Sequence, residues 1–290
     1  MVGSANKFGT FIYLLVIETD VNMPLKKYSA WMVRGLLLAL LLLGVQPLPA
    51  LGADPLVIWG GPATVKQVAL TFDDGPSPRY TPEILAVLQR YQAHATFFVL
   101  GRKVEKYPHL VQALLRAGNE VGNHTFDHPR LTKTAEAVRE SEVERTAVDL
   151  ELLGDRTSRW IRPPFSAYDD RFKDYVAHTR GRLVMWSIDS GDWKGLDRDT
   201  IVNNVVNRVR PGAIIIFHDS DEKDKADRSP TVEALKLILP ALQEKGYRLV
   251  TISQLVAGEN APKPAVLKGP NQPVKPRLDL GGPKIRSGSL

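Results

Sequence analysis

The chain has 290 residues, and its 43% hydrophobic and 24% charged content is ordinary for a folded protein, with room for one large α/β domain or two small ones. It contains no cysteine, so disulfides and thiolate metal sites are excluded, and any metal must be held by His, Asp or Glu. The formal net charge of +6 lies in the two ends, because the segment 53–258 carries as many acidic as basic residues. A nucleic-acid-binding surface on the folded part is therefore unsupported.

Residues 1–52 are expected to be an N-terminal extension that contains an export signal. An apolar run over 35–45 follows a basic stretch and leads to a small-x-small site at Ala50-Leu51-Gly52. This order is typical of a secretory signal peptide, and an uncleaved membrane anchor is the alternative. Met23 is the expected true start. We therefore expect an exported protein, periplasmic, cell-envelope or extracellular, that meets the membrane only through this segment if it stays uncleaved.

The segment 53–258 is predicted to be one domain in which strands and helices alternate. Seven strands are expected, at 66–72, 95–100, 119–122, 159–162, 183–188, 213–217 and 247–251. The main helices are expected from Thr81 to Tyr91 and over 103–117, 134–153, 199–210 and 231–245, the first with Thr81 as its cap.

Alternation of strands and helices implies a parallel sheet. The run 213–217 is apolar on both faces, as in a barrel strand that helices cover. Seven strands are one short of the eight-stranded barrel. We therefore predict a distorted or incomplete (β/α)7 barrel, with its active site at the C-terminal ends of the strands.

The segment 259–290 is expected to be a disordered tail. It contains six prolines, four glycines and a surplus of basic residues, with no hydrophobic periodicity. A segment of this composition does not bury enough apolar surface to fold.

Two adjacent carboxylates, Asp73 and Asp74, follow the first predicted strand at a Gly75-Pro76 turn. Adjacent side chains on a strand point to opposite faces, but where the backbone turns at a strand end both can point into one cavity. Two acids in one cavity repel each other unless a positive charge lies between them or they have different roles. For this motif alone, an ordinary Asp-rich turn is the alternative.

Two histidines, His124 and His128, follow the strand predicted at 119–122. Histidines four residues apart can bind one metal ion from a helical turn or a compact loop. A carboxylate from Asp73 or Asp74 would complete a His₂Asp set with an open position for water. The alternative is a pair of solvated loop histidines.

Three more polar residues, Arg162, Asp192 and His218, follow predicted strands. An arginine at the end of a buried strand needs a carboxylate partner, in a structural ion pair or in a functional site. A histidine there is either structural or, with Asp192 near enough to fix its tautomer and raise its pKa, a general acid. In parallel α/β folds the carboxyl ends of the strands gather at one site.

Together these clusters resemble the five motifs of the polysaccharide deacetylases with the NodB-homology domain, carbohydrate esterase family four. The matching segments are 71–76 (Thr-Phe-Asp-Asp-Gly-Pro), 124–128 (His-Thr-Phe-Asp-His), 162–165 (Arg-Pro-Pro-Phe), 189–193 (Asp-Ser-Gly-Asp-Trp) and 216–218 (Ile-Phe-His). Two positions depart from the family pattern. Ser166 stands where the family usually has Gly, and Ile216 replaces a Leu. Both touch the groove wall, so they bear on substrate preference more than on chemistry.

The resemblance implies the catalytic roles. Asp73 is expected to be the general base, oriented by Arg162. His218 is expected to be the general acid, tuned by Asp192. An amine leaves only when protonated, so the presence of both His218 and Asp192 favours amide substrates over esters.

The resemblance also implies a divalent metal bound by Asp74, His124 and His128. Zn²⁺ is the expected ion for a His₂Asp set, although Co²⁺ or Ni²⁺ would also fit.

Three further residues are expected to line the substrate groove. Trp193 and Ile216 are expected at the pocket for the acetyl methyl group, and the backbone amide of Phe165 is expected to help bind the oxyanion.

The expected function is exported, metal-dependent hydrolysis of N-acetyl groups on N-acetylglucosamine-containing glycans, peptidoglycan or chitin-like oligomers, with release of acetate. An O-acetyl xylan-type esterase of the same architecture and a non-catalytic carbohydrate-binding relative are the alternatives. We expect an acetylated polysaccharide or oligosaccharide as the partner, no nucleic acid, and a monomeric protein.

Overall fold

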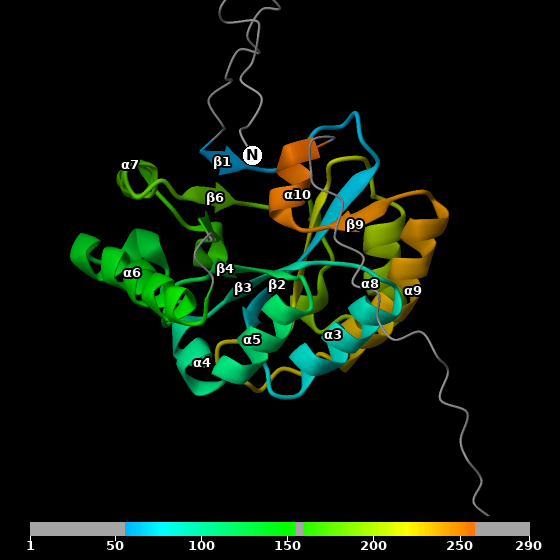
Figure 1. Ribbon diagram of the computed structural model, residues 1–290, viewed down its shortest axis with the longest axis horizontal. Coiled ribbons are helices and arrows are strands. Elements are labelled where there is room, and N and C mark those ends of the chain that lie inside the picture. Colours follow the sequence, from blue (N-terminus) through cyan, green and yellow to red (C-terminus); the bar gives the residue numbers. More distant parts are fainter. Residues whose placement is uncertain (1–55, 155–158, 259–290) are drawn as a thin grey trace, which may run out of the picture. The chain divides into compact units, whose positions relative to one another are not determined.

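The structure is a computed structural model that describes residues 56–154 and 159–258 (Figure 1). The predicted export signal and the predicted tail lie outside these residues. No helix in the described ranges has both the length and the apolar character to cross a membrane.

The described strands form one sheet, and each strand pairs with its neighbours in the parallel direction. The order is β1-β6-β5-β4-β3-β2-β8-β7, with β9 also paired to β2. The strands are β1 Val57–Ile58, β2 Gln67–Gly75, β3 Thr96–Val99, β4 Glu120–Asn123, β5 Trp160–Ile161, β6 Arg182–Val184, β7 Ile188–Asp189, β8 Ile214–His218 and β9 Arg248–Val250.

Strand β2 is the centre of the sheet. All nine of its residues are buried. It pairs with β9 near its start, with β8 along its middle, and with β3 near its end. Its Phe72 ring stacks on Phe97 of β3 and on Phe217 of β8, with centroids 4.9 and 5.6 Å apart. This packing fixes the end of β2, which carries Asp73 and Asp74, against its two neighbours.

One stretch of chain joins the two ends of the sheet. Strand β6 pairs with β5 and β1, whereas β7 pairs with β8. Only residues 185–187 separate them. The strand predicted at 183–188 is therefore two short strands that close a distorted barrel, and this agrees with the predicted fold class.

Helices cover the outside of the barrel (Figure 1). They are α3 Tyr80–Arg90, α4 Gly101–Lys106, α5 Pro108–Arg116, α6 Glu136–Leu152, α7 Asp170–His178, α8 Arg198–Val206, α9 Ser229–Glu244 and α10 Ile252–Ala257, with 3-10 turns η2 Leu131–Lys133, η3 Pro164–Ser166 and η4 Asp192–Lys194. The largest apolar core lies between the sheet and α3, α5, α8 and α9, and includes Ile84, Leu114, Val205 and Leu235.

Several predicted elements differ from the structure. The helix predicted over 103–117 is two helices, because Pro108 begins α5 at a position where its missing N–H costs no hydrogen bond. Thr81 is not the cap of α3: it lies inside the helix and its hydroxyl donates to the Asp219 carboxylate. The Ser77 hydroxyl instead accepts from the backbone N–H of Tyr80, 3.2 Å away. Strand β1 and helices α7 and α10 were not predicted.

Candidate active site

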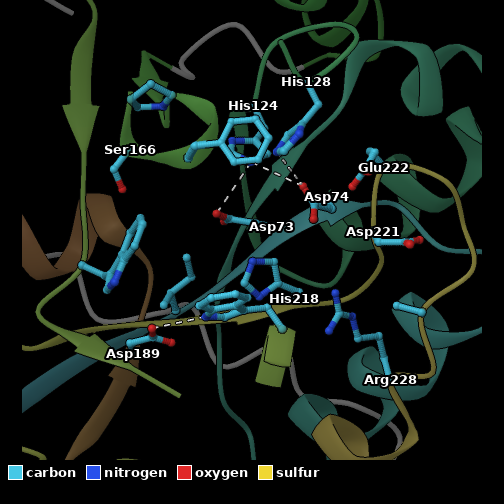
Figure 2. Close-up of a pocket in the computed structure, with 16 residues that line it drawn as sticks. Asp73, Asp74, His124, His128, Ser166, Asp189, His218, Asp221, Glu222 and Arg228 are labelled. Atoms are coloured by element: carbon cyan, nitrogen blue, oxygen red, sulfur yellow. Dashed lines mark hydrogen bonds and ion pairs between the residues drawn. The ribbon is translucent and has the colours of Figure 1, made fainter. Parts of the chain in front are cut away.

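A cavity of about 530 Å³ opens at the carboxyl ends of the strands. All five predicted clusters contribute to it. Its lining includes Asp73, Asp74, His124, His128, Phe165, Trp193, Ile216 and His218 (Figure 2). Arg162 and Asp192 are buried behind this lining, each bonded to one of its residues. The structure therefore brings together every residue that the sequence singled out.

Backbone geometry explains how the two adjacent carboxylates reach one cavity. The register between β2 and β3 shifts between Asp73 and Gly75. At the same point Asp74 adopts a left-handed conformation, with φ of 74°. Such a bulge re-aims a side chain that regular alternation would send to the other face. Figure 2 shows both carboxylates directed into the pocket.

Asp74, His124 and His128 form the cluster expected for a metal. One ligand atom from each lies within 4.8 Å of the others. The Asp74 Oδ1 atom is 3.4 Å from His124 Nε2 and 3.3 Å from His128 Nε2. This oxygen is buried and has no hydrogen-bond partner among the described residues. A buried, unpartnered carboxylate oxygen facing two imidazole nitrogens is the arrangement that a cation would satisfy.

The protonation states in this cluster also suit a cation. Burial raises the pKa of Asp74, but the histidine imidazoles around it, His124 foremost, outweigh burial and hold this pKa below its usual range. Burial and the neighbouring His124 lower the pKa of His128 to about 4. At neutral pH the cluster therefore offers a carboxylate and a neutral imidazole, which are the forms that bind metals.

The His124 ring is oriented by the main chain. Its Nδ1 lies 2.7 Å from the carbonyl oxygen of Arg162. In the neutral ring Nδ1 then carries the proton and donates it to this carbonyl. Nε2 keeps its lone pair and faces Asp74, as is usual for a histidine that binds a metal.

The histidine-bearing loop is held by a buried glutamate that sequence reasoning missed. Glu142 of α6 accepts hydrogen bonds from the backbone N–H groups of Phe126 and Asp127, at 2.9 and 2.7 Å. Both residues lie between His124 and His128. Nothing in the sequence marks Glu142, because it lies on a charged helix among other acidic residues.

Asp73 and Arg162 form a fully buried ion pair. The Asp73 Oδ1 atom accepts from Arg162 Nη1 at 2.7 Å. The same nitrogen donates to Thr71 Oγ1 at 2.8 Å, and the Nε of Arg162 donates to the Val184 carbonyl at 3.0 Å. The guanidinium carbon also lies 4.1 Å from the ring centroid of Phe98. Because Arg162 is held on all sides, it fixes the Asp73 carboxylate and keeps a positive charge beside it.

His218 and Asp192 form a second buried pair. Asp192 Oδ1 lies 2.9 Å from His218 Nδ1, and Oδ2 accepts from the His218 backbone N–H at 2.8 Å and from Thr231 Oγ1 at 3.0 Å. Burial lowers the pKa of His218, but the charge and hydrogen bond of Asp192 outweigh burial and raise this pKa to about 9. The imidazolium therefore persists at neutral pH, which suits a proton donor.

Two residues that sequence reasoning missed support this pair. Thr231 bonds to the Asp192 carboxylate, and Arg228 donates to the Asp192 carbonyl at 3.1 Å. Both lie at the start of α9, with Arg228 directly before its first residue and Thr231 in its first turn. Neither carries a motif signal, because their roles depend on distances across the fold.

The cavity mouth carries exposed aromatic rings. Phe165 is 54% exposed and Trp193 is 55% exposed, whereas Ile216, also in the cavity lining, is buried. The His128 ring meets the Phe165 ring edge-on, with centroids 4.7 Å apart. The Trp193 Nε1–H group donates a hydrogen bond to Asp189 Oδ2 at 3.3 Å, which holds the indole ring in place. Exposed aromatic faces beside a polar cleft suit the apolar faces of a sugar ring.

Ser166 lies beside Phe165, and both have left-handed backbones, with φ of 53° and 57°. This conformation is open to glycine without strain. The structure therefore gives a physical reason for the glycine that the resembling family usually has at this position. Ser166 lines the cavity, opposite Asp221 and Glu222 in the view of Figure 2.

Other lining residues were not predicted as site residues. They are Pro163, Ser166, Trp186, Asp189, Asp221, Glu222, Ala226 and Arg228. Pro163 and Asp189 belong to quoted sequence segments and Ser166 directly follows one, but the last four lie between β8 and α9, in a stretch that matches no motif.

Comparisons with known proteins agree with this site. Residues 60–183 match a family model described as polysaccharide deacetylase. A peptidoglycan-N-acetylglucosamine deacetylase of Bacillus cereus is 37% identical over 209 residues, which cover 69% of this chain and 92% of that protein. A chitooligosaccharide deacetylase of Azorhizobium caulinodans is 35% identical over 190 residues, which cover 63% of this chain and 90% of that protein.

A solved structure shows the same fold. A peptidoglycan N-acetylglucosamine deacetylase, crystallised in complex with 4-naphthalen-1-yl-N-oxidanyl-benzamide, is 35% identical and superposes with a TM-score of 0.67. The likeness covers 71% of this chain and 95% of that one.

Proposed function

Because this chain belongs to the polysaccharide deacetylase family, we propose that it removes N-acetyl groups from N-acetylglucosamine-containing glycans, peptidoglycan or chitin-like oligomers, and releases acetate. One observation carries the proposal. Two paired groups line the same cavity as the Asp-His-His cluster: the Asp73 carboxylate, which is bonded to buried Arg162, and the His218 imidazole, which is bonded to buried Asp192. These are the parts that amide hydrolysis needs.

We propose that Asp74, His124 and His128 hold a divalent cation, with Zn²⁺ as the first choice and Co²⁺ or Ni²⁺ as substitutes. When bound, the cation supplies a Lewis acid that polarises the acetyl carbonyl and acidifies a nearby water molecule. The donor set supports this assignment, because the unpartnered Asp74 oxygen and the two imidazole nitrogens lie close together in one buried cluster.

Asp73 is the proposed general base. Its carboxylate lines the cavity beside the Asp-His-His cluster, with Oδ2 3.8 Å from His124 Nε2. Arg162 donates a hydrogen bond to the other oxygen of this carboxylate and holds it in place. Asp73 therefore has one oxygen free to take a proton from the attacking water.

His218 is the proposed general acid. Its Nδ1 is engaged by Asp192, which leaves Nε2 as the atom that donates a proton to the leaving nitrogen. Asp192 keeps the ring protonated, since it raises the pKa of His218 to about 9. Proton donation matters most for amides, because an unprotonated amine is a poor leaving group.

Three residues are proposed to bind the substrate. Trp193 and Ile216 line the cavity near His218 and are proposed to contact the acetyl methyl group. The backbone amide of Phe165 is proposed to stabilise the oxyanion that forms as water adds to the carbonyl.

The proposed cellular setting follows from the sequence. We propose that the protein is exported and that the segment 53–258 acts as a monomeric catalytic domain. The apolar run at 35–45, with its basic flank and small-x-small site, supports export. The balanced charge of 53–258 supports a neutral glycan substrate over a nucleic acid.

Two alternatives are tested by the same experiment. Acetate release is measured from N-acetylated chitooligosaccharides, from peptidoglycan and from O-acetylated xylan, with and without a chelator. The proposal expects release from the N-acetyl substrates and its loss with chelator. Release from xylan alone would show an O-acetyl esterase, and stoichiometric metal with no release would show a carbohydrate-binding relative.

A His218→Ala variant sharpens this test. Its rate on the amide is expected to fall far more than its rate on an activated acetate ester, because a good leaving group needs little protonation. Equal losses on both substrates would contradict the assignment of His218 as the acid that protonates the leaving nitrogen.

A further inference from the structure

The first turn of α4 touches both halves of the site. On one side, the backbone N–H groups of Gly101 and Arg102 donate to the carbonyl oxygens of Thr125 and Phe126, at 3.0 and 3.4 Å. These carbonyls belong to the loop between His124 and His128. On the other side, Arg102 donates to the backbone carbonyl of Glu222, in the segment after His218.

Lys103 is the strongest of these links. Its side chain is only 3% exposed. Its Nζ donates three hydrogen bonds, to Ser220 Oγ at 2.8 Å, to the Asp221 carbonyl at 2.6 Å and to Asp224 Oδ1 at 2.5 Å. An ammonium group has three N–H donors, and all three of Lys103 bind to a single segment of the chain. This segment, residues 219–228, we name the acid-side loop.

The acid-side loop is shaped around this lysine. Ser220 Oγ lies 2.9 Å from Asp224 Oδ1, the same oxygen that Lys103 reaches. Asp224 itself has a left-handed backbone, with φ of 55°. The loop is therefore turned inward toward a buried positive charge, and the strain at Asp224 is offset by the contacts that its side chain makes.

This loop forms one wall of the cavity. Asp221, Glu222 and Ala226 line the cavity from it, and Figure 2 shows Asp221 and Glu222 on the same side of the pocket as Asp74. Neither residue bonds to Asp73 or His218 in any contact between described residues. The wall therefore faces the groove without belonging to the acid or base pairs.

The acid pair has its own supports. The Asp192 carboxylate is held by the backbone N–H of His218 and by Thr231, both outside the acid-side loop. Arg228 at the end of the loop joins the Ser220 carbonyl to the Asp192 carbonyl, at 2.9 and 3.1 Å, and its bonds do not involve Lys103. A change at Lys103 can therefore move the wall while the His218–Asp192 pair stays in place.

We propose that Lys103 is a positioning residue that holds the acid-side loop against the groove, and so sets the affinity for the sugar chain rather than the rate of acetyl transfer to water. The proposal rests on the glycan deacetylase function proposed above. Without Lys103, the Asp224 carboxylate loses its buried partner, and the Ser220 hydroxyl and the Asp221 carbonyl lose a donor, so the wall relaxes outward.

The test compares Lys103→Met with a matched control, Lys106→Met. Lys106 also approaches Asp224, with Nζ 3.8 Å from Oδ2, but its side chain is 60% exposed. Five quantities are measured on the full chain: bound metal, the rate on an activated acetate ester, KM for tetra-N-acetylchitotetraose, Kd for the same oligosaccharide, and amide hydrogen exchange over 219–228. Lys103→Met is expected to raise KM about tenfold and to speed exchange in the loop, with metal and ester rate unchanged. Lys106→Met is expected to change none of these.

An unchanged KM for Lys103→Met, or equal losses on ester and oligosaccharide, would overturn the proposal and leave Lys103 a purely structural residue. If Lys103→Met does not fold, Ser220→Ala decides, because it removes one of the three acceptors and should raise KM about threefold. Should the wild type hydrolyse no glycan, the proposed function fails, and the exchange data and the oligosaccharide Kd still decide the role of Lys103.

Discussion

Arg162 serves both sides of the site, because its side chain donates to Asp73 over 2.7 Å and its backbone carbonyl accepts from His124 over 2.7 Å. One residue therefore fixes the proposed base and orients one proposed metal ligand. The side chain acts on the base, whereas the carbonyl acts on the ligand. Substitutions at position 162 change the first contact and leave the second, so the two functions are experimentally separable.

The first prediction concerns the metal ligands. His124→Ala or His128→Ala is expected to abolish stoichiometric metal binding and activity while the circular dichroism spectrum stays native. Each variant removes one of three donors in a cluster whose atoms lie within 4.8 Å of one another. Metal content is measured by atomic emission after dialysis. His109→Ala, on α5 and away from the cavity, is the control, and full metal and turnover in either ligand variant would refute the assignment.

The second prediction concerns Asp73. Asp73→Asn is expected to keep the metal and to lose roughly two to four orders of magnitude in kcat, the range typical of general acid–base help. The amide is isosteric and still fits beside Arg162, but it takes up no proton. Kinetics and metal content are measured on the same sample. Loss of the metal would mean that Asp73 is a ligand and has exchanged roles with Asp74, whereas a near wild-type rate would mean that Asp73 is not the base.

The third prediction concerns pH. Because the pKa of His218 is raised to about 9, the proton donor is present at neutral pH and is lost as the pH rises through about 9. The amide rate is expected to fall on that alkaline limb. Asp192→Asn removes the charge that raises this pKa, so the limb should move to lower pH. A pH–rate profile that is the same for both proteins would show that His218 does not limit the reaction there.

The same shift affects stability. The folded state holds a proton on His218 that the unfolded chain releases near pH 6.5. Stability from this pair is therefore complete below about pH 6.5 and declines as the pH rises toward 9. Urea unfolding at several pH values measures this, and Asp192→Asn should flatten the decline.

The fourth prediction concerns Ser166. Its left-handed backbone, with φ of 53°, is strained for serine but not for glycine. Ser166→Gly is expected to stabilise the fold by about 0.5 kcal/mol, the relief of strain less the added entropy of the unfolded chain. Ala167→Gly is the control: with φ of −95° it relieves no strain and should destabilise by about 0.5–1 kcal/mol. Urea unfolding that shows the same loss in both variants would contradict the strain at position 166.

The sequence predicted the barrel, and it predicted that the polar candidate residues gather at one edge of the sheet, because both leave local signals. Phe165, Trp193 and Ile216 were named only through the family resemblance. Buried parallel strands appear in the sequence as apolar runs, and the polar residues that follow them meet at one edge of the sheet. Helix α7 and helix α10 were missed although each begins with a recognisable cap, Asp169 and Thr251. Both helices are short, with nine and six residues, so each offers few apolar positions.

Other features left no local signal at all. The strand predicted at 183–188 breaks because its two ends pair with opposite edges of the sheet, which only closure of the barrel decides. Glu142 and Lys103 act on loops that are distant in sequence, through hydrogen bonds that depend on the completed fold. A charged residue on a helix has the same appearance in the sequence whether it faces solvent or a buried loop.

The central position of β2 has a consequence for how the chain folds. Two of its three partners, β8 and β9, begin about 145 and 180 residues further along the chain. A ribosome releases β2 long before those partners exist, so β2 stays unpaired with them until they have been made. Contacts of such high sequence separation slow folding and make it late and cooperative. The pairing of β2 with β9 therefore cannot form before residues 248–250 have been made.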